Sequence, residues 1–253
     1  MRTISLTNHK GGVAKTTTTY ALGAGLEKKG YKVLLVDMDP QSNLSFAANV
    51  NLLKLENTLF DVFKGEATAK DALIKLSDNM DLLVGSIDLA AADRTFTQLG
   101  REKMLSKALK SLKKEYDFCI IDTPPSLGVM NENALTCSDM VIVPIQAEAY
   151  ALQGASQLKG FIDDIKENTN PNLEIAGILI TRVDTRTNLY KVLYPEFEKI
   201  AAMMGTKIYK TAIRSTITVG EAALERTSIY EHEPDATATK DYEAFVDEFL
   251  STL

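Results

Sequence analysis

The stretch Asn8–Thr17 (NHKGGVAKTT) carries the residue types that hold nucleotide phosphates. Its two glycines allow conformations and a close backbone approach that a β-carbon would hinder. Lys15 can reach β- and γ-phosphate oxygens, and the Thr16 hydroxyl can ligate Mg²⁺. A standard phosphate loop anchored on these two residues needs glycine where this chain has His9 and Ala14. The stretch is therefore either a plain glycine-rich turn or a phosphate loop of a different kind.

Two further polar clusters follow apolar runs and favour the phosphate-loop interpretation. Asp37 and Asp39 follow KVLLV, and Asp122 ends YDFCIID, where a Thr-Pro-Pro turn begins. A carboxylate after a buried strand is typical of a residue that holds a metal ion or its water. Each aspartate alone is more simply explained as a turn or capping residue. A loop lysine and three such carboxylates together predict a Mg-nucleotide site.

Apolar runs alternate with helix-length amphipathic segments along the whole chain. Several of these runs are apolar at both odd and even positions. Such runs indicate strands buried on both faces, and the alternation predicts an α/β fold with a mostly parallel, twisted sheet between helix layers. The carboxyl ends of the strands, where ligands bind in such sheets, should hold the three polar clusters. We expect one domain over residues 1–253. The expected strands are Thr3–Thr7, Lys32–Val36, Met80–Val84, Phe118–Ile121, Met140–Val143, Ile175–Thr181 and Lys207–Ala212, and the expected helices are Lys15–Lys29, Arg101–Lys114, Tyr150–Asn168 and Asn188–Met204.

Composition indicates a globular chain of 253 residues with 45% hydrophobic residues and a formal net charge of −6. No apolar run approaches the roughly 20 residues of a membrane span, and the start opens directly into a strand pattern, so we expect no signal peptide. Two cysteines, Cys119 and Cys137, make no disulfide framework and favour a reducing cytoplasm. His9 and His232 are too dispersed to suggest a metal or acid–base pair.

The motifs together resemble the ParA/Soj partition ATPases of the deviant-Walker P-loop family. The matching stretches are KGGVAKTTT, LLVDMDPQSN, YDFCIIDTPPSLG, VIVPIQAEAYALQG and ITRVDTRTN, and they cover nearly the whole chain. The resemblance implies a three-layer P-loop fold, ATP and Mg²⁺ as cofactors, and a slow ATPase that dimerises around two nucleotides. The family's loop begins Lys-Gly-Gly, so His9 is expected, and the departure that remains is Ala14.

The resemblance also implies roles for individual residues. Lys10 would reach the partner subunit's phosphates, where a cation stabilises developing charge. Asp39 would position the attacking water, and the adenine base would lie against Ile213 and Ser215, although Ser215 is shorter than the family's asparagine. The remaining expected roles are phosphate binding by Gly11, Gly12, Val13, Ala14, Lys15, Thr16 and Thr17, and magnesium binding by Thr16, Asp37 and Asp122.

Ala14 stands where most members of this family have glycine. If that position requires a positive φ, its methyl group crowds the backbone approach to phosphate. We expect reduced affinity or altered turnover, and the site itself to persist.

DNA is an expected partner, because the family binds nonspecific DNA as ATP dimers. Residues 182–214 hold seven basic and three acidic side chains, a local charge of +4, which leaves −10 for the remainder. Arg186 matches a family DNA contact, and Arg182 and Arg214 lie in the same segment. A second family arginine is missing near Ile217 or Thr218.

Other partners and functions follow from the same resemblance. We expect a ParB-like activating protein, and a cytoplasmic location that becomes nucleoid-associated if DNA is bound. The acidic C-terminal segment KDYEAFVDEFLSTL would be repelled by anionic lipid, so we expect a helix packed on the domain and no membrane. A cargo-positioning or regulatory ATPase that binds no DNA remains an alternative, as does a nucleotide-dependent metabolic synthetase.

Overall fold

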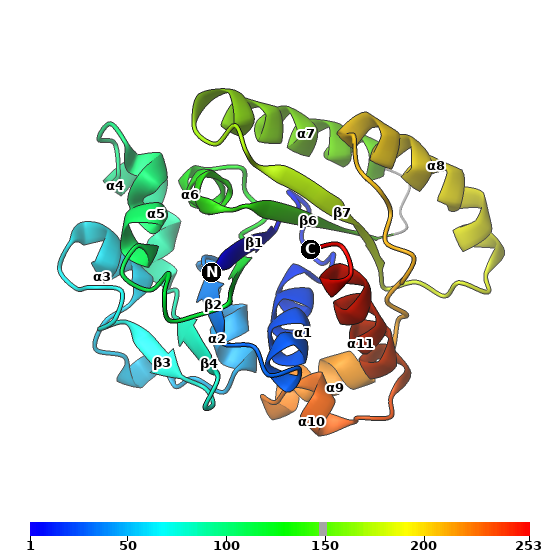
Figure 1. Cartoon of the computed structure of the whole chain (residues 1–253), viewed down its shortest axis with the longest axis horizontal. Coiled ribbons are helices and arrows are strands. Elements are labelled where there is room, and N and C mark those ends of the chain that lie inside the picture. The colour runs from blue at the N-terminus through cyan, green and yellow to red at the C-terminus, as the bar shows by residue number, and fades with distance from the viewer. Residues whose placement is uncertain (147–150) are drawn as a thin grey trace.

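One seven-stranded sheet organises the chain (Figure 1). The computed structural model describes residues 1–146 and 151–253. The strand order is β3-β4-β2-β5-β1-β6-β7, and all neighbours are parallel except the edge pair β3 and β4. This arrangement confirms the expected α/β fold. The strands are β1 (Arg2–Leu6), β2 (Val33–Asp37), β3 (Leu73–Lys75), β4 (Met80–Leu83), β5 (Phe118–Asp122), β6 (Met140–Gln146) and β7 (Glu174–Thr181).

Helices cover both faces of the sheet, which gives three layers (Figure 1). On one face lie α1 (Lys15–Lys28) and α11 (Thr237–Leu250), whose apolar side chains share a core with one set of strand residues. On the other face lie α3 (Leu59–Lys64), α5 (Met104–Leu109), α6 (Val129–Cys137), α7 (Ala151–Asn168) and α8 (Asn188–Met204). The shorter helices are α2 (Asn43–Ala47), α4 (Ala92–Thr95), α9 (Thr218–Glu225) and α10 (Ile229–His232), with 3₁₀ turns at Leu52–Lys54, Ile87–Ala91 and Arg101–Lys103.

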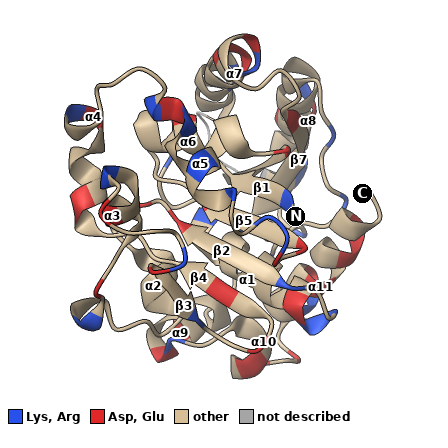
Figure 2. Cartoon of the chain, turned by 60° about the vertical axis from the view of Figure 1, so that its left-hand side comes forward, with Lys and Arg blue, Asp and Glu red and all other residues tan. Residues whose placement is uncertain are grey.

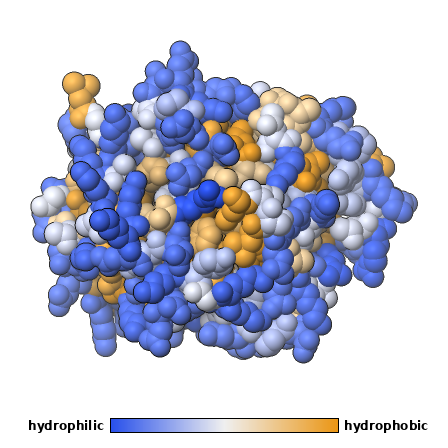
Figure 3. Space-filling view, viewed as in Figure 1, coloured by the Kyte–Doolittle hydropathy of each residue, from blue (hydrophilic) through white to orange (hydrophobic). Residues whose placement is uncertain are grey.

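Strand β2 illustrates why the central runs are apolar at both parities. Val33 and Leu35 join the core beneath α1 and α11, whereas Leu34 and Val36 join the core beneath α3, α5 and α6. Successive strand residues point to opposite faces, and here both faces are covered by helices. On the face that Figure 3 shows, a patch of apolar residues lies near the middle, and smaller apolar patches lie toward the edges.

The predicted strand Lys207–Ala212 is wrong. The segment touches β7 through an isolated bridge, Ile178 to Ile208, rather than a continuous ladder. The carboxylate of Glu248 on α11 accepts hydrogen bonds from the backbone N–H groups of Lys210 and Thr211, at 2.7 and 2.9 Å. Those two donors are therefore engaged by α11, and the segment becomes a link between β7 and α11.

Other boundaries also differ from the expectation. The helix expected over Arg101–Lys114 is a 3₁₀ turn followed by α5, which ends at Leu109. The short strand β3 was not predicted. Tyr150, the expected first residue of another helix, lies outside the described residues, and the described helix begins at Ala151.

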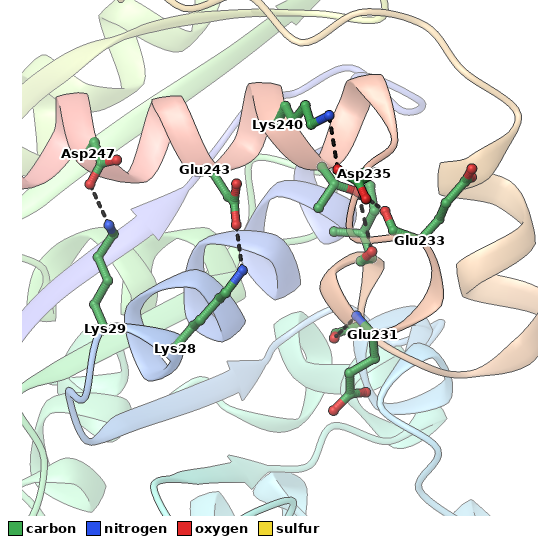
Figure 4. A network of polar contacts seen from close by, with 11 residues as sticks. Lys28, Lys29, Glu231, Glu233, Asp235, Lys240, Glu243 and Asp247 are labelled. Carbon is green, nitrogen blue, oxygen red and sulfur yellow. Dashed lines mark hydrogen bonds and ion pairs between the residues drawn. The ribbon is translucent and has the colours of Figure 1, made fainter.

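The acidic C-terminal segment packs on the domain as predicted. Tyr242, Phe245 and Phe249 of α11 are completely buried, and the helix lies along α1 (Figure 1). Two lysines at the end of α1 pair with α11, Lys28 with Glu243 and Lys29 with Asp247 (Figure 4). Over residues 1–146 and 151–253, no helix is long and apolar enough to cross a membrane.

Candidate nucleotide-binding site

The polar clusters meet at the carboxyl ends of β1, β2 and β5. In the sheet order β1 lies between β5 and β6, so later strands of the chain lie on both sides of β1. Open α/β sheets bind ligands at a point where the strand order reverses in this way. A cleft of about 1310 Å³ opens there. It is lined by loop residues Gly11, Gly12 and Ala14–Thr17, by Asp39, and by Ile213 and Ser215. Most residues predicted for phosphate and base binding therefore share one cleft.

The phosphate loop turns into α1 through a left-handed residue. Ala14 has φ 63° and ψ 31°, a conformation that disfavours a β-carbon. Ala14 therefore has the positive φ on which the expected crowding of phosphate by its methyl group depends. Gly12 also has a positive φ, of 79°, whereas Gly11 has open space where a β-carbon would stand. The loop thus keeps glycine at one left-handed position and strains alanine at the other.

Lys15 lies buried at the base of this loop, with its ammonium 3.0 Å from the carbonyl oxygen of Lys10. Burial lowers the pKa of the Lys15 ammonium, and the carboxylates of Asp122 and Asp39 oppose that effect. The side chain is therefore held inside the loop, near the carboxylates that frame the cleft. A phosphate entering the cleft would offer it a stronger acceptor than a backbone carbonyl.

Three aspartates lie at the strand ends beside the phosphate loop, and of these Asp39 lines the cleft. Asp37 and Asp122 are register partners on β2 and β5, and both are completely buried. The Thr16 hydroxyl donates to Asp122 at 2.6 Å, and the hydroxyl and N–H of Ser45 donate to Asp37 at 2.7 and 2.9 Å. Asp39 lies beyond the strand and accepts from the N–H of Gln41 at 2.9 Å.

Burial dominates the electrostatics of this acidic pair. It raises the pKa of Asp37 to about 6, against hydrogen bonds that lower it. It raises the pKa of Asp122 to about 8, with a further increase from the Asp37 charge. A cation bound beside the two carboxylates would offset their charge and lower both pKa values.

The donor set fits magnesium bound together with a nucleotide. The described residues contain no cluster of three or more His, Cys, Asp or Glu side chains that would hold a metal alone. Mg²⁺ usually keeps several waters and takes one or two protein oxygens besides substrate phosphates. Thr16 beside Asp122 offers that arrangement, in which the hydroxyl would be a direct ligand and the carboxylates would hold bound waters.

Lys10 and Val13 face a different hollow. They line a second cavity of about 340 Å³ on the other side of the loop, together with Asn8, His9 and Gly154. The backbone N–H of Lys10 donates to Asn8 Oδ1 at 3.0 Å. Lys10 is therefore not among the residues that line the cleft of its own subunit.

The turn at which we expect the base is anchored by α11. Ile213 is buried in it, Ser215 is exposed, and Arg214 between them binds Asp241 through its backbone N–H and its guanidinium, with a shortest contact of 2.6 Å. The hydroxyl of Thr216 lines the same cleft and is buried without a partner among the described residues. Thr216 is a further candidate for base contact.

The three arginines expected at DNA have different surroundings. Arg186 is exposed in the loop before α8, and its guanidinium pairs with Asp184 at 2.9 Å. Arg214 is tied to Asp241, and Arg182 donates to the carbonyl of Gly12 at 3.0 Å; both line the nucleotide cleft. Of the three, Arg186 alone lies away from that cleft. Basic and acidic residues are interspersed along the ribbon in the view of Figure 2.

The sequence analysis did not identify Asp241, Thr216 or the loop contact of Arg182 as parts of the site. Asp241 lies in the C-terminal helix, and the amphipathic pattern of that helix predicts only that it packs on the domain. The contact of Arg182 with Gly12 spans 170 positions, so no local pattern could reveal it. A basic residue directly after a buried strand was the one available signal for Arg182.

Comparisons with known proteins agree with this geometry. A protein-family model described as AAA domain matches residues 1–175. The chain is 38% identical to the sporulation initiation inhibitor protein Soj of Bacillus subtilis over 242 residues, 94% of each chain, and 36% identical to the chromosome partitioning protein ParA of Caulobacter vibrioides, over 88% of this chain and 84% of that one.

A solved structure with the same fold contains a nucleotide and magnesium. Cobyrinic acid a,c-diamide synthase from Mycobacterium smegmatis, with bound ADP and magnesium, has a TM-score of 0.86 and 35% identity, over 99% of this chain and 94% of that one. The family, the acidic cleft and the phosphate loop identify an ATPase that uses ATP and Mg²⁺. The chain belongs to the ParA/Soj-type P-loop partition ATPases.

Proposed function

We propose that the protein is an ATP-dependent switch for partitioning a chromosome or plasmid. In this proposal residues 1–253 act as one ATPase domain that dimerises around two ATP molecules and binds nonspecific DNA in that state. Slow hydrolysis, stimulated by a ParB-like protein, ends the DNA-bound state. The switch would thus work in the cytoplasm, on the nucleoid.

The observation that carries the proposal is the open, apolar border of the nucleotide cleft. Ile217 and Leu224 are each 79% exposed, and both line the cleft that holds Lys15 and Thr16. Phe46 on α2 also lines the cleft, with the Arg226 guanidinium 4.1 Å from its ring centre. Exposed apolar side chains grouped at a site mark an interaction surface. A second subunit seated there would cover both the apolar residues and the nucleotide.

The catalytic roles follow from this dimer. Lys10 would act on the partner's nucleotide, which accords with its place outside the cleft of its own subunit. Lys15 and the loop N–H groups would hold the phosphates, Thr16 would ligate Mg²⁺, and Asp37 and Asp122 would hold its waters. Asp39 lies in the cleft with an oxygen available beyond its contact to Gln41, and it would orient the attacking water.

DNA binding rests on charge distribution. Residues 182–214 carry +4 in a chain of net charge −6. The exposed Arg186 precedes α8, and the exposed Lys191 lies in its first turn. A local basic segment is enough to bind DNA nonspecifically, provided that it faces outward in the dimer.

Sizing by light scattering, with ATP or ADP and with or without random duplex DNA, tests the proposal. We expect a monomer with ADP, a dimer with ATP, and DNA association of the dimer only. Asp39→Ala should retain ATP, because it leaves the loop intact and removes the group that orients water, so its dimer should persist longer. A monomer in every nucleotide state would refute the switch.

Two alternatives make different predictions in the same assay. A regulatory or cargo-positioning ATPase would dimerise with ATP and ignore DNA at low salt. An amide synthase is favoured by one observation, the 35% identity to the cobyrinic acid a,c-diamide synthase. That activity predicts ATP turnover that rises with a carboxylic acid substrate and an amide donor. ATPase rates measured with each addition separate the three functions.

A further inference from the structure

The carbonyl oxygens of the phosphate loop are held by donors from outside it. The Thr181 hydroxyl at the end of β7 lies 3.1 Å from the carbonyl oxygen of Val13. The next residue, Arg182, places its guanidinium 3.0 Å from the carbonyl oxygen of Gly12. Thr181, the last residue of β7, and Arg182, which follows it, therefore each donate a hydrogen bond to one of two successive peptide carbonyls of the loop.

This arrangement fixes the direction of the loop N–H groups. In a trans peptide the C=O and the N–H of the following residue point in opposite directions. Donors on the carbonyls of Gly12 and Val13 therefore direct the N–H groups of Val13 and Ala14 the other way. Neither N–H has an acceptor in the part of the chain that the structure describes. Unpaired N–H groups fixed in this way form a concave anion site.

The backbone of Arg182 is strained, which supports a functional reason for its position. Its φ is 54°, a left-handed conformation that costs a non-glycine residue about 1 kcal/mol or more. The turn occurs at the point where the chain leaves β7 and its side chain bends toward the loop. Strain of this kind concentrates at functional sites.

The other arginines of the basic segment differ from Arg182. Arg186 and Arg214 are each paired with a carboxylate, whereas no Asp or Glu of the described residues forms an ion pair with Arg182. Its charge is therefore available at the cleft, beside Lys15 and Thr16. A positive charge there adds to the attraction for phosphate.

We propose that Thr181 and Arg182 are positioning residues that orient the phosphate loop for ATP, and that Arg182 serves the nucleotide rather than DNA. The inference rests on the proposed phosphate site. It adds two hydrogen bonds, from Thr181 and Arg182 to the loop carbonyls, and we call this pair of contacts the brace.

Competition binding of ATP and of inorganic tripolyphosphate tests the proposal. The brace acts on phosphate contacts, so Arg182→Ala should weaken both ligands by the same factor, about 3- to 10-fold, as expected for one hydrogen bond. Arg182→Gly should lose as much, because it relieves the strain and still lacks the guanidinium. Arg182→Lys should recover much of the affinity, and Thr181→Val should lose a similar factor. Arg94→Ala, at an exposed arginine on α4, should bind both ligands like the wild type.

Several outcomes would overturn the inference. Arg182→Ala could bind both ligands as the wild type does, or lose ATP while it keeps tripolyphosphate, which would place the side chain at the base or ribose. Loss of DNA association at saturating ATP, with nucleotide affinity unchanged, would return Arg182 to the DNA surface. Lys15→Ala separates the inference from the site itself. If Lys15→Ala binds ATP normally, the loop is not the phosphate site and both proposals fail. If Lys15→Ala loses ATP binding while Arg182→Ala binds ATP as the wild type does, only the inference about Thr181 and Arg182 fails.

Discussion

The hydroxyl of Thr16 lies 2.6 Å from the carboxylate of Asp122, which joins the first turn of α1 to the end of β5. Asp37 stands beside Asp122 on β2, so this hydroxyl donates to one member of a buried acidic pair. This contact would keep Thr16 in place as the magnesium ligand that we propose. The carboxylate that would hold the metal's water also orients the threonine that would bind the metal.

Asp122→Asn should weaken ATP binding in Mg²⁺ and leave metal-free binding nearly unchanged. The amide can still accept from Thr16, but it carries no charge to hold a hydrated cation. A hydrogen bond to a charged group contributes about 1.5–3 kcal/mol, so we expect a loss of about 10- to 100-fold in Mg²⁺. Titrations in Mg²⁺ and in EDTA measure the difference. Asp139→Asn is the matched control, because Asp139 accepts from Thr3 at the opposite end of β1. Equal losses in both buffers would contradict this role.

The same pair predicts how stability changes with pH in the metal-free protein. The pKa values of Asp37 and Asp122, about 6 and about 8, are raised above that of an unfolded aspartate, about 4. The folded state therefore keeps protons that the unfolded state has released, so these groups lower the free energy of unfolding as pH rises from about 4 to about 8.

Asp122→Asn removes one of these groups, so it should gain stability relative to wild type between pH 5 and pH 8.5. We expect a relative gain of about 1–3 kcal/mol at the higher pH. Urea unfolding in EDTA at both pH values measures it. A constant difference between variant and wild type over that range would show that Asp122 titrates normally.

The fold and the phosphate side of the site were predictable because their signals are local. A loop between a strand and a helix, and aspartates at strand ends, can be recognised within ten residues. The segment Lys207–Ala212 was wrongly predicted as a strand, because Glu248, 38 and 37 positions away, accepts hydrogen bonds from the backbone N–H groups of Lys210 and Thr211. The contacts of Arg182 and Asp241 were hidden for the same reason, since each partner lies far off in the sequence.

Asp241 should stabilise the protein and support the base side of the site. Its carboxylate is largely buried and binds the backbone and guanidinium of Arg214, next to Ile213 and Ser215. Asp241→Asn should lower the free energy of unfolding by about 1–3 kcal/mol. It should also weaken ATP binding and leave tripolyphosphate binding unchanged, because the turn lies at the base.

Lys240→Ala is the matched control for Asp241. Lys240 precedes Asp241 on α11 but pairs with the exposed Asp235 (Figure 4). Exposed pairs contribute about 0–1 kcal/mol, so this variant should unfold nearly as wild type does. An equal loss of ATP and tripolyphosphate affinity in Asp241→Asn would indicate a general loosening instead.

Asp184→Asn should strengthen DNA binding if Arg186 contacts DNA. The two exposed side chains pair at 2.9 Å, so Asp184 offsets the charge of the arginine. Removing Asp184 releases that charge, and Arg186→Ala should reduce the salt dependence of binding by about one phosphate contact. DNA titrations of the ATP-bound protein at several salt concentrations measure both effects. Asp163→Asn gives the same change in net charge on α7, where the partner is Lys159, and it should have no effect. Equal gains from the two variants would assign the effect to net charge alone.

Ala14→Gly should stabilise the protein and tighten ATP binding. Alanine at φ 63° carries a strain of about 1–2 kcal/mol, of which glycine's greater unfolded-state entropy offsets about 0.5–1 kcal/mol. The expected net gain is about 0.5–1 kcal/mol in the free energy of unfolding. Asn49→Gly is the control, because Asn49 has φ 60° but asparagine tolerates that conformation, so its substitution should change little. If Ala14→Gly leaves stability, ATP affinity and turnover unchanged, the loop accommodates the methyl group without strain. A gain confined to ATP affinity would instead mean that the methyl group crowds phosphate and leaves the empty loop unstrained.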